Sequence, residues 1–114
     1  MSEILELNRE EITRLSRMDD IDGHAWALYL LLKKHMDVYT GVVQVEKKVL
    51  VSVSKKQLHL RGSESANYNH IDALINALVK VEVISDFLLI KDVLSVTLPI
   101  AFSETCLESS YSHH

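Results

Sequence analysis

The side chains in this sequence best suited to chemistry are cations gathered in one stretch. Residues 33–61 carry seven Lys and Arg residues against two acidic residues, a local charge of +5, although the whole chain has a net charge of −4. Local field governs the encounter with a charged ligand, so an acidic protein can still present a basic face to a polyanion. The residues expected to contact phosphate groups are Lys47, Lys48, Lys55, Lys56 and Arg61.

Catalytic and metal-binding patterns are not found in the sequence. It has no glycine-rich phosphate loop, no Gly-x-Ser-x-Gly elbow and no pair of histidines four residues apart. The separations between His24, His35, His59 and His70 fit no standard zinc spacing. The single cysteine, Cys106, has no neighbouring His or basic group to activate it. We therefore expect no enzyme activity, no metal and no cofactor.

Length and composition predict one folded domain. The chain has 114 residues, 47% of them hydrophobic and 25% charged, with one Pro and three Gly. We expect a single domain over residues 1–101, with residues 102–114 as a polar tail that is either disordered or partly a cloning remnant. The start of the chain has no signal-peptide pattern, and its longest apolar run, residues 25–32, is too short to span a bilayer. We expect a soluble cytoplasmic protein.

The hydrophobic periodicity predicts two helices in the first third. Asn8 lies three positions before Glu11, a capping-box pattern that predicts a short helix over 9–18. Asp19, Asp20 and Asp22 lie at the start of a second helix over 21–36, which is apolar on most sides and so is predicted to be central and buried.

The middle and last thirds alternate between strand and helix patterns. β-branched residues from Val42 to Val53 predict a short strand, and Ser52 or Ser54 caps a following helix that Arg61 and Gly62 end. The segment 63–65 caps an amphipathic helix over 65–80, whose apolar face is Ile71, Leu74, Ile75, Leu78 and Val79. Beyond it, 83–90 and 93–98 are predicted to form a β-hairpin with Lys91 and Asp92 in the turn.

This order of elements is that of a winged helix, an α+β fold in which a helix-turn-helix precedes a two-stranded wing, here with an extra N-terminal helix. The sequence resembles small winged-helix DNA-binding proteins of bacteriophage and plasmid replication and regulatory modules. The resemblance covers most of residues 5–101 and is carried by 7–13 (LNREEIT), 33–43 (KKHMDVYTGVV), 71–84 and 96–99 (VTLP).

The resemblance implies duplex DNA binding, in replication initiation or in transcriptional regulation of a mobile element. The helix over 65–80 would enter the major groove and read bases with residues near its start. The base-reading candidates are Asn67, Tyr68, Asn69 and His70, and the backbone contacts are Lys47, Lys48, Lys55, Lys56, Arg61 and, on the wing, Lys91. Twofold helix-turn-helix proteins read repeated half-sites, so a homodimer is expected, with Ile4, Leu5 and Leu7 needing cover.

The sequence also departs from this pattern. The predicted recognition helix has no Lys or Arg before Lys80, and Glu64 and Asp72 have the wrong sign for contact with phosphates. The alternative is a winged helix that serves as a protein-interaction module and docks on a host or replisome factor through its acidic surfaces.

Overall fold

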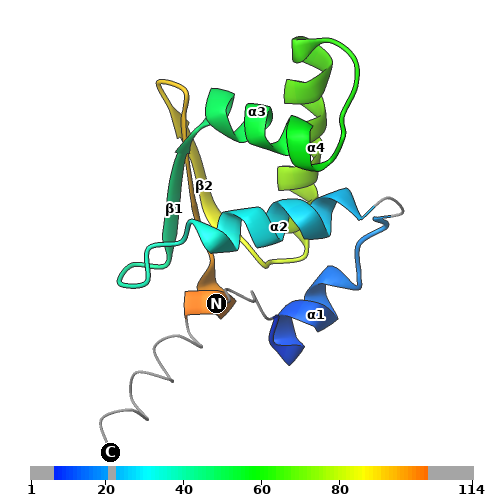
Figure 1. Cartoon of the computed structure of the whole chain (residues 1–114). Coiled ribbons are helices and arrows are strands. Elements are labelled where there is room, and N and C mark those ends of the chain that lie inside the picture. The colour runs from blue at the N-terminus through cyan, green and yellow to red at the C-terminus, as the bar shows by residue number, and fades with distance from the viewer. Residues whose placement is uncertain (1–6, 21–22, 103–114) are drawn as a thin grey trace, which may run out of the picture.

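The computed structural model describes residues 7–20 and 23–102, which form a small α+β domain (Figure 1). Its elements in chain order are α1 (Arg9–Leu15), α2 (His24–Lys34), β1 (Val42–Glu46), α3 (Lys47–Gln57), α4 (Glu64–Lys80), β2 (Ser85–Ile90) and β3 (Val93–Thr97). A further helical turn covers 99–102. The predicted α+β class is confirmed.

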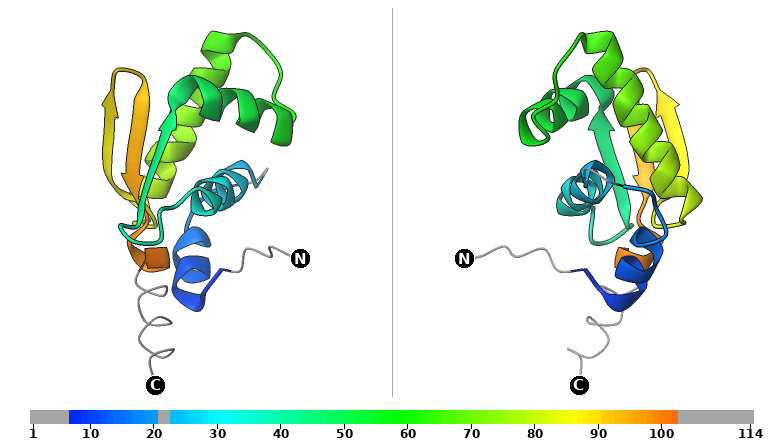
Figure 2. Two further views of the ribbon diagram at one scale, coloured as in Figure 1. Left: turned by 60° about the vertical axis from the view of Figure 1, so that its left-hand side comes forward. Right: turned by 90° about the vertical axis from the view of Figure 1, so that its right-hand side faces the viewer.

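The three strands form one antiparallel sheet in the order β1-β3-β2. β1 pairs with β3 from Val42 opposite Thr97 to Glu46 opposite Val93. Figures 1 and 2 show the sheet at one side of the molecule, with α2, α3 and α4 packed against one face of the sheet. The buried strand residues Val43, Leu94 and Val96 alternate with more exposed neighbours, as expected for a sheet covered on one face.

The predicted hairpin turn is confirmed at Lys91 and Asp92, between β2 and β3. Both residues have positive φ angles, 49° and 66°, as a two-residue turn that follows the twist of its strands requires. The register of the hairpin shifts between Ser85 and Leu88, which marks a β-bulge, and Asp86 there also has a positive φ angle.

Helix α1 begins with the predicted capping box. Asn8 Oδ1 accepts a hydrogen bond from Glu11 N at 2.8 Å, and Glu11 Oε1 accepts one from Asn8 N at 2.9 Å. The helix ends at Leu15, three residues earlier than predicted. At the start of α2, the Asp20 carboxylate accepts from the backbone N–H groups of Ala25 and Trp26, both at 3.1 Å. These contacts satisfy amide groups that helix starts leave unpaired.

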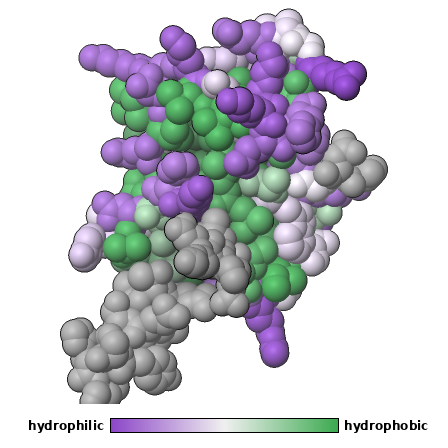
Figure 3. All heavy atoms as spheres, in the orientation of Figure 1, coloured by the Kyte–Doolittle hydropathy of each residue, from purple (hydrophilic) through white to green (hydrophobic). Residues whose placement is uncertain are grey.

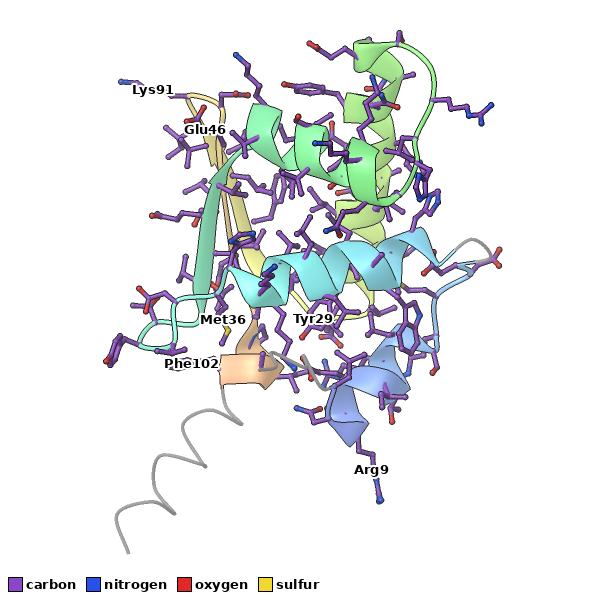
Figure 4. The ribbon with its side chains drawn as sticks, in the orientation of Figure 1. Arg9, Tyr29, Met36, Glu46, Lys91 and Phe102 are labelled. Atoms are coloured by element: carbon purple, nitrogen blue, oxygen red, sulfur yellow. The ribbon has the colours of Figure 1, made fainter. Side chains whose placement is uncertain are left out.

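A buried carboxylate joins α1 to α2. The Glu11 side chain is completely buried, accepts a hydrogen bond from Tyr29 Oη and pairs with Lys33 Nζ at 2.8 Å. Figure 4 shows Tyr29 below α2, on the side that faces α1. A buried charge is costly without partners, and the contacts with Tyr29 and Lys33 supply them while joining α1 to α2. It also removes Lys33 from the cations available to a ligand.

The strand predicted from the valines after residue 42 is shorter than expected. β1 ends at Glu46, and Val49, Val51 and Val53 belong to α3, whose N-cap is Glu46 rather than Ser52 or Ser54. The buried residues of α3 are Lys47, Leu50, Val51 and Ser54, which recur at helical spacing. Packing of that face outweighs the strand propensity of the valines.

Helix α4 packs against α2 and α3, and its predicted apolar face is largely confirmed. Ile71, Leu74, Ile75 and Leu78 are buried, whereas Val79 is 38% exposed at the edge of that face. The second predicted helix begins later than expected, at His24, and Ile21 and Asp22 lie outside the described residues.

The fold extends to Phe102, which the sequence placed in the tail. Gly41 has a φ angle of +74°, and a Cβ atom there would lie 2.6 Å from the Phe102 Cβ. Figure 4 shows Phe102 and Met36 at the end of the domain away from the hairpin turn. Predictions about Ile4, Leu5, Cys106 and residues 103–114 lie outside the described residues, whereas Leu7 packs against the protein's own core. No helix within the described ranges is both long and apolar enough to cross a membrane.

Candidate nucleic-acid interface

The exposed cations of the candidate interface lie on α3 and in the loop that follows it. Lys48 and Lys55 are seven residues apart, two turns on the same side of the helix, and Lys56 follows directly. These three residues and Arg61 are all exposed. The only acidic residue between positions 47 and 71 is Glu64. Residues 48–70 therefore carry four exposed cations against one exposed carboxylate.

Two adjoining hollows bring the α3 lysines together. Lys48 and Lys55 line one of about 240 Å³ between α3 and the start of α4, together with Tyr68 and Glu64. Lys55 and Lys56 line the other, of about 540 Å³. Ser52 and Lys55 belong to both hollows, so the lysines share a continuous surface. Figure 3 shows hydrophilic side chains gathered over this upper part of the molecule.

Lys47 is not part of that exposed surface, which corrects its predicted role as a phosphate contact. Its side chain is only 4% exposed and its Nζ forms an ion pair with Asp72 Oδ1 of α4. The same Nζ lies 5.4 Å from the centre of the Tyr68 ring. The contact also compensates Asp72, so one of the two carboxylates on α4 expected to repel phosphate is already paired.

The start of α4 lies next to these lysines. Ser63 caps the helix by accepting a hydrogen bond from Ala66 N at 3.1 Å, as predicted for the segment 63–65. Tyr68 is half-buried in the first hollow. Its partial burial raises the pKa of the phenol, and the carboxylates of Asp92 and Glu64 raise it further. A phenol keeps its proton at neutral pH in any case, and Tyr68 can donate a hydrogen bond.

Asn67 is not available for base reading, contrary to its prediction. It is 3% exposed and lines the floor of the hollow between α3 and α4, and its Nδ2 has no hydrogen-bond partner within the described residues. The signal for this burial is present in the sequence. Asn67 precedes Ile71, Leu74 and Leu78 at helical spacing and so belongs to the buried face of α4.

His70 and Asn69 have different surroundings. His70 is half-buried, and its Nε2 lies 3.0 Å from Nδ1 of His24, with the two rings edge to face at 82°. One ring nitrogen must donate and the other accept, so this contact joins α4 to the start of α2. Asn69 is exposed. Among the described residues, no three His, Cys, Asp or Glu side chains are grouped to hold a metal ion.

The outward face of α4 contains exposed residues beyond those predicted to read bases. Exposed residues recur at Ala66, Asn69, Ala73, Asn76 and Lys80, three or four positions apart. The sequence contains a signal for this stripe, because these residues lie on the side of the helix opposite the predicted apolar face. Two of the stripe's five side chains are alanines, and the amides of Asn69 and Asn76 can donate and accept hydrogen bonds.

The hairpin end carries the remaining predicted contact, Lys91. Figure 4 shows Lys91 at the tip of the hairpin, pointing away from the body of the molecule, with Glu46 at the same end. Lys91 lines neither of the two hollows beside α3. The turn nevertheless contacts the start of α3, because Lys47 N donates a hydrogen bond to Asp92 O at 2.7 Å.

Comparison with known proteins gives no match: no family model, no curated protein and no solved structure matches this chain.

Proposed function

We propose that this chain is a winged-helix protein that binds duplex DNA, with α3 and α4 as the helix-turn-helix and the β2–β3 hairpin as the wing. The element order from α2 to β3 and the strand order β1-β3-β2 support this assignment. The observation that carries it is the group of exposed lysines Lys48, Lys55 and Lys56 along the two hollows beside α3, one of which reaches the start of α4. Arg61 adds an exposed cation in the loop that leads to α4.

In this proposal α3 binds the DNA backbone and α4 contacts the bases. The cations of α3 and its loop bind phosphates, which sets the position of the protein on the duplex without selecting a sequence. The outward face of α4 lies in the major groove, where Asn69 and Asn76 contact base edges. An Asn amide bonds bidentately to adenine, a contact worth ~1–3 kcal/mol of discrimination. The protein would act in the cytoplasm, in replication initiation or in transcriptional control of a mobile element.

The test is a fluorescence anisotropy titration of random duplex at low salt. Reversing three cations of the interface, K55E/K56E/R61E, should weaken binding by more than about tenfold. The matched control, R9E/R17E/K34E, makes the same change in net charge at exposed residues of α1, the following loop and α2. Equal loss in both variants would show that only net charge matters and would overturn the assigned interface.

A protein-interaction module is the second candidate, favoured by the absence of Lys and Arg from α4 before Lys80. This function predicts no binding to duplex at low salt, and instead saturable binding to a host or replisome protein. That binding should be unaffected by K55E/K56E/R61E and weakened by neutralising acidic residues.

A further inference from the structure

The edge strand β2 exposes four large hydrophobic residues in succession. The strand order places β1 and β2 at the two edges of the sheet. β1 has exposed polar residues at Gln44 and Glu46, whereas the exposed fractions along β2 are 44% for Phe87, 52% for Leu88, 44% for Leu89 and 56% for Ile90. Soluble proteins usually protect such an edge with charges or proline, and 87–90 contains neither.

The exposed segment has defined ends. The β-bulge between Ser85 and Leu88 limits it on one side, and the turn at Lys91 and Asp92 limits it on the other. Ile90 and Val93 flank a two-residue turn, so we expect Phe87 and Leu89 to direct their backbone N–H and C=O groups away from β3. Figure 2 shows β2 on the outside of the molecule in both views, with no helix covering its edge.

We propose that β2 pairs antiparallel with β2 of a second copy of this chain, around a twofold axis at Leu88. The charges at the ends of the segment support this occupant. Asp86 lies at one end and Lys91 at the other, so antiparallel pairing brings each Lys91 next to the second copy's Asp86, twice in the dimer. Parallel pairing would instead place like charges together. A register centred on Leu89 would place Asp86 opposite the second copy's Asp92.

The pairing also matches the hydrophobic side chains. With the axis at Leu88, Phe87 lies opposite the second copy's Leu89 on the helix-covered face, and the two Leu88 side chains meet on the other face. Cross-strand aromatic–aliphatic pairs of this kind stabilise antiparallel sheets. A twofold axis perpendicular to the sheet keeps both sets of helices on the same side of the joined six-stranded sheet.

The first test is sedimentation equilibrium of the full chain without DNA, which makes the result independent of the proposed function. The wild type should sediment as a dimer and L88K as a monomer. The matched control is V38K, because Val38 is 53% exposed in the loop before β1, and it should remain dimeric. Circular dichroism establishes that the variants are folded. A wild type that is monomeric, or an L88K dimer, would overturn the proposal.

The second test is disulfide cross-linking in a C106S background. Opposite residues in an antiparallel pair have Cα atoms ~4.5–5.5 Å apart, so L88C should cross-link to its own copy in the second chain. The two Ile90 positions would be offset by four residues, about 13 Å, so I90C should not cross-link efficiently. Efficient cross-linking of I90C but not of L88C would refute the assigned pairing.

Discussion

Replacing Lys55, Lys56 and Arg61 together by alanine should remove most of the salt dependence of DNA binding. Each neutralised phosphate contributes about 0.9 to the slope of log K against log salt concentration. The four exposed cations Lys48, Lys55, Lys56 and Arg61 therefore give a slope of about −3.6, and the triple variant retains about −0.9. Between 50 and 200 mM salt, wild-type affinity should fall about 150-fold and that of the variant only about 3.5-fold.

The assay is an anisotropy titration against random duplex at four or more salt concentrations. Two single variants make the assay more specific. K55M removes one positive charge from an exposed position, and K47M removes one from a buried position. K55M should reduce the slope by about 0.9, whereas K47M should leave it unchanged, since Lys47 is paired with Asp72. A triple variant with the wild-type slope, or a K47M variant that lowers the slope as much as K55M, would refute this reasoning.

The structure supports three further predictions. E11L should lower the free energy of unfolding by about 3 kcal/mol in urea denaturation, because Lys33 loses a buried partner, and E11L/K33M should recover part of that loss. N69A should relax base preference in a competition assay with defined duplexes, whereas N67L should preserve it, because Asn67 is buried. G41A should lower the melting temperature by several degrees, because its φ angle is +74° and the new Cβ would overlap Phe102; an unchanged melting temperature would contradict this.

Local pattern was sufficient to predict the parts of the fold held by nearby residues. The capping box at Asn8, the turn at Lys91 and Asp92, and the buried face of α4 all depend on neighbours within a few positions. The strand predicted through Val53 was wrong, because valines two residues apart resemble a strand until packing selects the helical face containing Leu50 and Ser54.

The candidate site was less accessible to sequence reasoning. The cluster of lysines in residues 33–61 predicted which part of the chain carries exposed cations. The partner that buries Lys47 is Asp72, 25 residues away in the sequence. No local pattern indicates such a pairing. Asn67 is different, since its spacing from Ile71 already assigned it to the inner face, and a polar side chain there was mistaken for a ligand-binding one.

Lys47 joins three elements through one residue. Its backbone holds the hairpin turn at Asp92, and its side chain holds Asp72 on α4, while the residue itself starts α3. Lys47 thus contacts the hairpin and the second helix while it begins the first helix. A mutational scan that scores only loss of DNA binding would count Lys47 among the phosphate contacts, although replacing its side chain would act through the position of α4, where Asp72 lies, and not through a lost phosphate contact.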